Sequence, residues 1–531
     1  SSSSSSSSSS ASKSAKSAAS GGKSMSKIRT VVKKGRAPVD DQCPVAAKCH
    51  VYESGSDVYD CMLNQTNIGN NNNKYYMVQL LETDSKGTYY VWTRWGRVGK
   101  VNGTNNLPCG SNLDQAKKEF CKKFKDKTRN EWSQRASFSA VKGKYVLMEM
   151  DYGNDDDSKD KGLDEEDEEG EEPEEQEESK LESSVQELVK TIFDTNMMKK
   201  QMVEIGYDAD KLPLGKLTKK HVQKGYEVLK QISDVLEKKK KGNLSDLSSD
   251  FYTLIPHDFG MKTPPVIRSS HDVKQKIEMV DSLADIALAT SLIKGTKGSS
   301  NLIDSHYSTL HCHISPVQDQ AQVDLVKKMV KQTHAKTHDR YTLDVEQIFA
   351  LEREGEDALY KKHAHLNNKL LLWHGSRLTN YVGILSNGLR IAPPEAPVTG
   401  YMFGKGVYFA DMSSKSANYC NTSKTAPYGF MLLAEVACGE SALKYKHDYN
   451  AAALPPGTHS TKGVGITYPT EFEDLPGGVQ APCGKPLEDP KLKGKTTLLY
   501  NEYIVYDTSQ IKMKYLVKLK FNYKDDDDDD W

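Results

Sequence analysis

Residues 371–420 read LLWHGSRLTNYVGILSNGLRIAPPEAPVTGYMFGKGVYFADMSSKSANYC, and residues 498–507 read LLYNEYIVYD. Both stretches follow Gly295, in a part of the chain where short apolar runs alternate with Gly and Pro. Such runs, at 430–436, 501–506 and 515–521, are typical of short strands bounded by turns. The sequence therefore predicts a mixed, strand-rich domain over residues 300–524.

The region before this domain has a different hydrophobic period. Between residues 181 and 299, apolar residues recur at steps of three and four, as in Val185, Leu188 and Ile192. This spacing is typical of amphipathic helices, and Ser184 with Glu187 has the pattern of a capping box. We therefore predict an all-α bundle.

Residues 59–152 have the composition of a third, mixed domain. Strand-like runs at 74–81 and 88–94 are joined by the turn-like Asp84-Ser85-Lys86-Gly87, and residues 113–132 look helical. The helix carries a basic face, formed by Lys117, Lys118, Lys122, Lys123, Lys125 and Lys127. Such a face is usually only solvated, but it could also lie along phosphates.

Charge is segregated along the 531 residues, although 72 basic and 73 acidic side chains nearly cancel. From residue 12 to residue 36 every charged side chain is basic, among Ser, Ala and Gly, and residues 154–178 are almost all Asp, Glu and Gly. Segments this polar lack the apolar surface needed to fold. We expect a disordered basic arm over 1–58, an acidic linker over 153–180 and an acidic tail over 525–531.

Cysteine usage and hydropathy exclude some classes of protein. The nine Cys residues contain no Cys-x-x-Cys pair and no set at zinc-finger spacing, so we predict no metal site. Because no apolar stretch is long enough to span a bilayer, we expect no membrane partner.

The two stretches quoted first closely resemble the catalytic domain of the poly(ADP-ribose) polymerase family. Residues 273–295, VKQKIEMVDSLADIALATSLIKG, resemble its regulatory helices, and residues 92–100, WTRWGRVGK, resemble its Trp-Gly-Arg domain. The resemblance covers about residues 60–523. It implies a mixed α/β Trp-Gly-Arg domain, an all-α regulatory bundle and an α+β ADP-ribosyltransferase domain with mainly antiparallel strands. The layout, with a short basic arm and no zinc fingers, is similar to the second, DNA-dependent member of the family.

The resemblance implies an enzyme that uses NAD+ as a substrate and needs no true cofactor. The family's catalytic His, Tyr and Glu correspond to His374, Tyr408 and Glu502. Taken singly, each could equally be an ordinary structural residue, and only the flanking sequence favours catalysis. The Rossmann glycine pattern for NAD is missing, because Gly404-Lys405-Gly406 lacks the third Gly, which disfavours hydride chemistry.

The same resemblance implies a set of NAD-binding residues with positioning roles. His374 and Arg390 would contact the adenosine side, while Gly375 and Ser416 would hold the nicotinamide amide. Tyr408 and Tyr419 would offer flat aromatic surfaces, with Tyr419 stacking on nicotinamide. The weaker assignments in the same segment are Ser376, Asn380 and Gly383.

For DNA strand breaks, the resemblance implies contacts from four residues of the Trp-Gly-Arg domain, mainly to phosphate. These residues are Asn73, Trp95, Arg97 and Tyr145. It also implies autoinhibition by the helical domain. We expect Glu278, Asp281 and Asp285, which share one helix face, to lie toward the NAD pocket, with ordinary exposed carboxylates as the alternative.

The resulting expectation is a nuclear, DNA-break-activated ADP-ribosyltransferase that makes poly(ADP-ribose) on itself and on chromatin and repair proteins. An accessory factor could complete its acceptor site. Three alternatives stay open: a mono-ADP-ribosyltransferase of the same fold, a catalytically silent DNA-end scaffold, and an NAD glycohydrolase.

Overall fold

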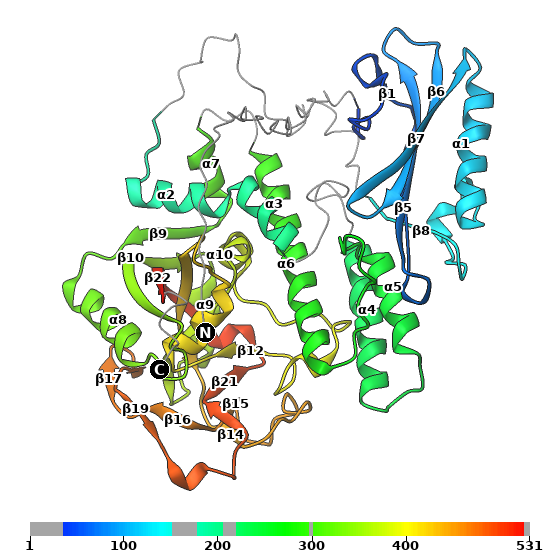
Figure 1. Cartoon of the computed structure of the whole chain (residues 1–531). Helices are drawn as coiled ribbons and strands as arrows, with labels where there is room; N and C mark the ends of the chain where they lie inside the picture. The colour runs from blue at the N-terminus through cyan, green and yellow to red at the C-terminus, as the bar shows by residue number, and fades with distance from the viewer. Residues whose placement is uncertain (1–34, 151–177, 205–218, 297–300, 525–531) are drawn as a thin grey trace, which may run out of the picture.

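The computed structural model describes residues 35–150, 178–204, 219–296 and 301–524. Figure 1 shows three units: a sheet backed by one long helix, a group of helices, and a strand-rich body. Most of the expected basic arm, nearly all of the expected acidic linker and the expected acidic tail lie outside the described residues. Among the described residues, no helix is long and apolar enough to cross a membrane.

The first unit is an antiparallel sheet in the order β7-β6-β5-β4-β8, with β1 pairing off this path to β5. Its strands are β1 (Cys49–Val51), β4 (Asp60–Asn67), β5 (Asn72–Thr83), β6 (Tyr89–Arg97), β7 (Lys100–Gly110) and β8 (Val146–Leu147). The expected turn joins β5 to β6, with Lys86 and Gly87 both at positive φ. Glycine tolerates that conformation at no steric cost, which explains its place there.

Helix α1 (Leu113–Thr128) covers one face of this sheet. It begins at Asn112, whose side chain accepts a hydrogen bond from the Gln115 N–H, and it buries Ala116, Phe120 and Phe124. The last helical residue is Thr128, four residues earlier than the sequence predicted, and the C-cap Arg129 has the left-handed conformation. Trp132 instead starts a short 3-10 segment and packs edge-on against Phe120.

Residues 35–58 correct the expected boundary of the basic arm, because they are folded onto the sheet. Val39 and Cys43 are buried against Trp92. The Asp40 carboxylate accepts hydrogen bonds from the Trp92 indole at 2.8 Å and from the Arg94 guanidinium at 2.6 Å. The short apolar run between two polar stretches is enough to anchor this segment.

The second unit is all-α, and its helices share one apolar core with the strand-rich body. The helices are α2 (Ser183–Ile192), α3 (Thr195–Glu204), α4 (Lys219–Leu236), α5 (Leu244–Leu254), α6 (Ser270–Gly295) and α7 (Leu302–Ser308). The capping box predicted at Ser184 was wrong. Helix α2 already begins at Ser183, so Ser184 lies inside it, and the side chain of its N-cap, Glu182, makes no capping hydrogen bond. A full capping box forms instead between Ser269 and Asp272 at the start of α6.

The third unit is built on the sheet β17-β18-β11-β13-β22-β10-β9. Its strands are β9 (Cys312–Pro316), β10 (Tyr341–Arg353), β11 (Lys369–Gly375), β13 (Tyr428–Ala437), β17 (Phe472–Leu475), β18 (Val479–Pro482) and β22 (Ile511–Tyr523). Neighbouring strands are antiparallel except β11 with β18. Helix α8 (Gln320–Gln332) buries Leu325, Val326 and Met329 in the core on one side of this sheet.

Two smaller sheets complete this unit, in the orders β12-β21-β15-β14 and β19-β16-β20. Their strands are β12 (Val407–Phe409), β14 (Ser441–Lys444), β15 (Ser460–Gly463), β16 (Gly465–Pro469), β19 (Pro486–Glu488), β20 (Leu498–Tyr500) and β21 (Glu502–Val505). The first of these small sheets meets the larger sheet where Ala410, which follows β12, pairs with Trp373 of β11. This junction brings the ends of β11, β12 and β21 together, although they are far apart in the sequence.

The helical unit joins the other two units, and its longest helix is α6. Helix α6 packs on α4 and also on α10 (Tyr381–Asn387) of the strand-rich body, while α5 packs on β4 of the first sheet. In Figure 1, α6 stands between the strand-rich body and the pair α4 and α5, and the first sheet lies beyond that pair. The helical unit therefore separates the first sheet from the junction of β11, β12 and β21.

Candidate active site

A cavity of about 750 Å³ lies at that junction, with α6 forming one of its walls. It brings together nearly all the expected NAD-binding and regulatory residues: His374, Gly375, Ser376, Asn380, Arg390, Tyr408, Ser416, Tyr419 and Glu502 with Glu278, Asp281 and Asp285. Gly383 does not line it. Gly383 lies in α10, where an added Cβ would come within 3.0 Å of an Asp285 carboxylate oxygen, so it permits close approach of α10 to α6.

His374 lies near the end of β11 and is fixed by one hydrogen bond. Its Nδ1 is 2.9 Å from the carbonyl oxygen of Tyr408. Burial lowers the pKa of this imidazole, which keeps it neutral near pH 7. Since a carbonyl oxygen can only accept, the proton resides on Nδ1 and Nε2 is left as an acceptor. His374 is therefore suited to accept a hydrogen bond from a hydroxyl in the cavity.

Tyr408 uses its hydroxyl to shape the adjoining loop. The hydroxyl donates to the carbonyl oxygen of Gly404 at 2.7 Å and accepts from the Phe403 N–H at 2.9 Å. Burial raises the pKa of the phenol, so it stays protonated. With its hydroxyl committed to the loop, Tyr408 presents mainly its ring to the cavity.

Gly375 and Ser416 form a narrow part of the wall. A Cβ at Gly375 would lie 1.8 Å from the backbone carbonyl oxygen of Ser416, so any other residue would push the two segments apart. The Ser416 hydroxyl donates to the carbonyl oxygen of Trp373 at 3.0 Å. Ser416 is held in α11 (Ser413–Ala417), whose other serines are buried.

Glu502 forms an ion pair with a residue that the sequence did not single out. Its Oε1 lies 2.5 Å from the Nζ of Lys415, and both side chains are less than one-fifth exposed. Glu502 is the first residue of β21, and Lys415 belongs to α11. A lysine between two serines has no distinctive local signal, so only the fold reveals this partner.

The three α6 carboxylates have different surroundings. Asp285 is nearly buried and pairs with the Arg390 guanidinium, while Asp281 accepts a hydrogen bond from the Tyr226 hydroxyl. Burial raises the pKa of Asp281 to about 7 and that of Asp285 to about 6. Glu278 is more exposed and lies 3.8 Å from the Nζ of Lys274.

Lys274 of α6 also covers Tyr419, which the sequence places against nicotinamide. Its Nζ is 5.3 Å from the centre of the Tyr419 ring and 3.4 Å from the ring hydroxyl. Through Lys274 and Asp285, α6 therefore contacts two of the expected NAD-binding side chains, Tyr419 and Arg390.

The four expected DNA-binding residues divide into two groups. Asn73 is buried and donates to the carbonyl oxygen of His257 at 2.8 Å. Arg97 donates to the carbonyl oxygens of Gly260 at 2.5 Å and Lys262 at 2.7 Å. Both therefore hold the first sheet to the helical unit.

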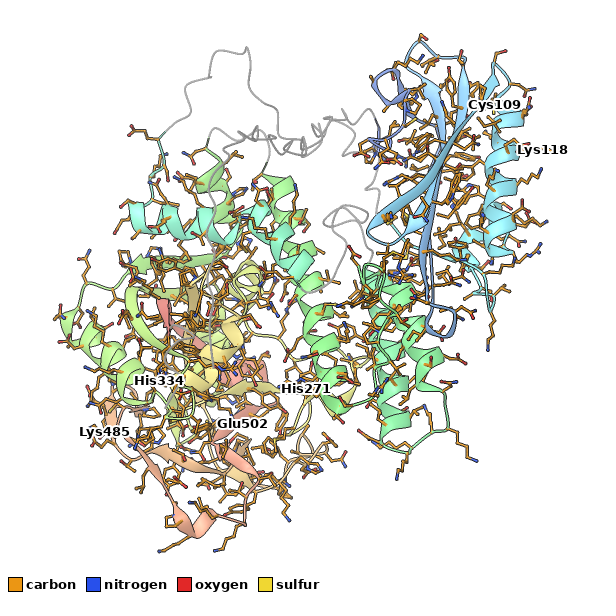
Figure 2. The ribbon with its side chains drawn as sticks, viewed as in Figure 1. Cys109, Lys118, His271, His334, Lys485 and Glu502 are labelled. Atoms are coloured by element: carbon orange, nitrogen blue, oxygen red, sulfur yellow. The ribbon has the colours of Figure 1, made fainter. Side chains whose placement is uncertain are left out.

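Trp95 and Tyr145 instead belong to an aromatic cluster around Tyr76. Tyr76 stacks on Trp95 with ring centres 5.8 Å apart and meets Tyr145 edge-on at 6.2 Å. Lys127 lies 4.3 Å from the centre of the Tyr76 ring, and Lys74 lies 5.3 Å from that of Tyr145. Lys118, which like Lys127 belongs to α1, projects outward from the sheet (Figure 2).

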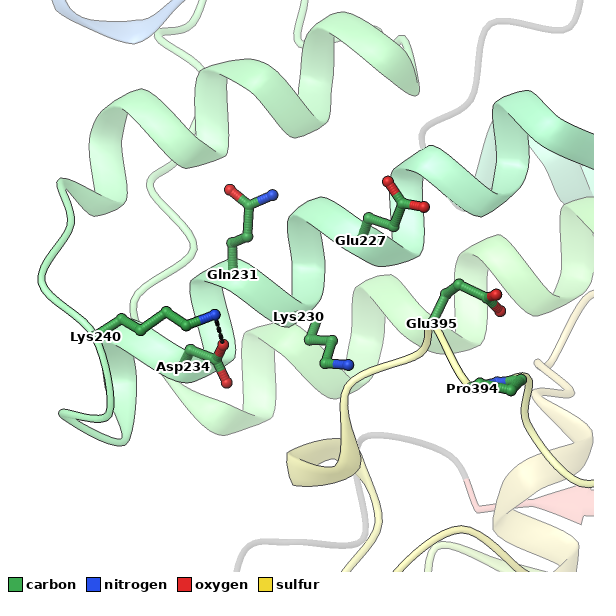
Figure 3. Close-up of a pocket in the computed structure, with 7 residues that line it drawn as sticks. All are labelled: Glu227, Lys230, Gln231, Asp234, Lys240, Pro394 and Glu395. Atoms are coloured by element: carbon green, nitrogen blue, oxygen red, sulfur yellow. Dashed lines mark ion pairs between the residues drawn. The ribbon is translucent and has the colours of Figure 1, made fainter.

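A second hollow, of about 480 Å³, lies between α4 and the loop that contains Pro394 (Figure 3). Its lining is mainly charged, and Lys240 pairs with Asp234 at 2.8 Å at one end of it (Figure 3). Beside it, the Gln223 amide donates to Glu395 at 2.6 Å and so ties the loop to α4. The larger cavity, which has both aromatic and polar walls, is the better candidate for a ligand site.

Comparison with known proteins gives the family. The model of the poly(ADP-ribose) polymerase catalytic domain matches residues 321–521, that of the regulatory domain matches 179–307, and that of the WGR domain matches 59–139. The chain belongs to the poly(ADP-ribose) polymerase family. The expected family and fold class, with mainly antiparallel strands in the catalytic unit, are thereby confirmed.

Relatives match over almost the whole chain. The polymerase is 48% identical over 505 residues to "Poly [ADP-ribose] polymerase 2" of Arabidopsis thaliana, an alignment that covers 93% of this chain and 78% of the relative. The protein of the same name from Homo sapiens is 44% identical over 504 residues, covering 93% and 85%. "Poly [ADP-ribose] polymerase 1" of Gallus gallus is also 44% identical, but the alignment covers only 49% of that relative.

The polymerase is therefore an NAD+ ADP-ribosyltransferase, with NAD+ as its substrate. Among the residues that the structure describes, no group of three or more His, Cys, Asp and Glu side chains could hold a metal ion.

Proposed function

We propose that this polymerase is activated by DNA strand breaks and that His374, Tyr408 and Glu502 form its catalytic centre. The observation that supports this most directly is the shared cavity: the three side chains, from β11, β12 and β21, face one space whose other wall is α6. The same space is thus suited to catalysis and to control by the helical unit.

Cleavage of NAD+ breaks the bond between nicotinamide and ribose. The leaving group is already a pyridinium and departs neutral, so it needs no general acid, and positive charge develops on the ribose. One well-placed carboxylate can stabilise that charge. Glu502 would do so while accepting a hydrogen bond from the nicotinamide ribose, and it would next polarise the hydroxyl of the growing chain.

Lys415 would hold the Glu502 carboxylate in place before NAD+ binds. A lysine ammonium 2.5 Å away fixes the direction of one carboxylate oxygen. The second oxygen would then be directed at the ribose.

The remaining cavity residues would position the dinucleotide. His374 would accept a hydrogen bond from the adenosine ribose through Nε2, as its tautomer allows. Gly375 and Ser416 would hold the nicotinamide amide beside the Tyr419 ring. Arg390 would reach the adenosine side, and Asn380 would support this wall through its 3.0 Å hydrogen bond to Ser376.

DNA would bind at the aromatic cluster of Tyr76, Trp95 and Tyr145. The lysines beside these rings offer phosphate contacts, which read no base sequence. Asn73 and Arg97 would act differently, since their contacts with the helical unit would transmit binding at the first sheet to α6.

The acceptors would be the polymerase itself and chromatin and repair proteins in the nucleus, with an accessory factor completing the acceptor site. Most of the basic segment 12–36, which suits both nucleic acid and a nuclear address, lies outside the described residues.

Labelled NAD+ tests this function when the purified protein is incubated with and without nicked DNA and run on a denaturing gel. We expect a smear of high molecular weight that requires DNA. A sharp band would favour mono-transfer, free labelled ADP-ribose would favour a glycohydrolase, and no labelling would favour a silent scaffold.

Lys127→Ala should reduce the slope of log affinity for DNA against log salt concentration by about one, and Lys118→Ala should leave this slope unchanged.

The pH dependence of the DNA-independent rate gives a second prediction. In the closed state, burial and the nearby Asp285 and Glu278 raise the pKa of Asp281 to about 7, although Tyr226 and Arg390 lower it. In an open state the carboxyl would return to its ordinary pKa near 4. Closure therefore takes up a proton, and the closed state loses stability as pH rises through 7.

We expect the ratio of the DNA-independent rate to the DNA-stimulated rate to increase about tenfold between pH 6 and pH 8. Asp281→Asn removes the titrating group and should make this ratio nearly constant. Taking the ratio cancels any pH effect on the chemical step. A wild-type ratio that stays constant over this range would contradict the prediction.

A further inference from the structure

The backbone pairing of β21 with β12 stops at Tyr503, the residue next to Glu502, and does not include Glu502 itself. Tyr503, Ile504 and Val505 of β21 pair with β12, but the next residue of the β12 segment, Ala410, hydrogen-bonds to Trp373 of the other sheet instead. On the opposite side, Glu502 pairs with Gly463 of β15. In the described ladder, Glu502 is therefore supported by strand pairing on one side only.

Asp411 continues this ladder through its side chain. The register of β12 and β21 places Asp411 opposite Asn501, and the Asp411 Oδ2 accepts hydrogen bonds from the Asn501 amide at 2.8 Å and from the Tyr503 hydroxyl at 3.1 Å. Asn501 in turn accepts from the Gly465 N–H at 2.9 Å. Asp411, Asn501 and Tyr503 are all buried. One buried carboxylate thus ties down both chain neighbours of Glu502.

The same residue sits at the start of the segment that carries the partner of Glu502. Asp411 lies four residues before Lys415. The hydroxyl of the intervening Ser414 accepts a hydrogen bond from the Ala335 N–H and forms another with His338 Nδ1, each 2.8 Å long. Both members of the Lys415–Glu502 pair are therefore attached, through the chain, to Asp411.

We propose that Asp411 is a positioning residue that sets the direction of the Glu502 carboxylate by holding Asn501 and Tyr503. It lies behind the cavity and is not among the side chains that line it. The proposal rests on the catalytic role of Glu502 proposed above. Displacement of a reacting group by about 1 Å is enough to lower a rate about 100-fold, so such support matters for turnover.

The test compares Asp411→Ala with Asp411→Asn in the full-length, DNA-activated protein. Alanine removes the acceptor, and we expect kcat to fall about 10- to 100-fold while KM for NAD+ changes less than about threefold. The inhibition constant of nicotinamide should not change, because Gly375 and Ser416 are untouched. Asparagine keeps an acceptor oxygen, and it should restore kcat to within about fivefold of the wild type.

The matched control is Glu356→Gln. Glu356 is also a buried carboxylate of this unit; it accepts from the Met513 N–H at 2.8 Å and is not among the cavity-lining residues. This variant should keep kcat within about twofold. If Asp411→Ala does not fold, Tyr503→Phe tests the same point, because it keeps the ring, removes one bond and should lower kcat several-fold at unchanged KM.

The proposal is overturned by an unchanged kcat in Asp411→Ala or Tyr503→Phe, by a KM that rises as kcat falls, or by an equal loss in Glu356→Gln. It is also overturned if Asp411→Asn is as impaired as Asp411→Ala, since charge and not the hydrogen bonds would then matter. Glu502→Gln in the same assay separates the two ideas. If that variant stays active, the proposed catalytic role fails; if it is inactive while Asp411→Ala is normal, only the positioning role fails.

Discussion

Glu502→Gln should lower ADP-ribose transfer by about 100- to 1,000-fold. The change keeps the size of the side chain but removes the negative charge opposite the developing positive charge of the ribose. It also leaves Lys415 without the carboxylate that lies 2.5 Å from its Nζ. The unpaired ammonium would then stand beside the reaction and repel that charge further. The measurement is kcat with nicked DNA, together with the length of the labelled chains.

The matched control for this prediction is Glu435→Gln. Glu435 is a similarly shielded glutamate of β13 that faces a lysine, with Lys514 at 3.3 Å, but it lies outside the cavity. Loss of charge there should leave kcat nearly unchanged. A Glu502→Gln enzyme with more than about one-tenth of wild-type kcat would contradict the proposed role. A variant that still labels protein with single ADP-ribose units would restrict Glu502 to chain extension.

The sequence could identify most of this site because its residues lie in segments with distinctive neighbours. His374 and Tyr408 fall within one recognisable stretch, and Glu502 falls within a second. Lys415 was missed although it lies in the first stretch, because the ion pair depends on how α11 meets β21. The helical spacing of Asp281 and Asp285 predicted a shared face, but not the partners Tyr226 and Arg390, which come from other helices and loops.

The fold was predictable where a hydrophobic period was strong. The core positions of α2 and the turn between β5 and β6 follow from local pattern. Strand β7 was missed because its sequence, KVNGTNNLPCG, is polar and contains Gly and Pro, and therefore resembles a loop. It lies at the edge of the sheet, where its pairing with β6 keeps it extended. Residues 35–58 were missed because basic residues precede a short apolar run whose partner, Trp92, lies far along the chain.

The double variant Lys274→Ala/Asp285→Asn should raise the DNA-independent rate about 10- to 100-fold. Lys274 covers the Tyr419 ring, and Asp285 pairs with Arg390, so α6 competes with NAD+ for both side chains. Each contact stabilises only the closed state. Removing both shifts the population toward the open state without touching the catalytic residues. The measurement is kcat/KM for NAD+ in the absence of DNA.

The rate with saturating nicked DNA should stay within about twofold of the wild type, because DNA already favours the open state. Glu187→Gln is the matched control. It breaks an ion pair between the same two units, with Lys518 at 2.6 Å, but that pair is outside the cavity and largely exposed on one side. If Glu187→Gln activates the enzyme equally, loosening of the whole interface controls activity. If neither variant does, α6 does not compete with NAD+ through these contacts.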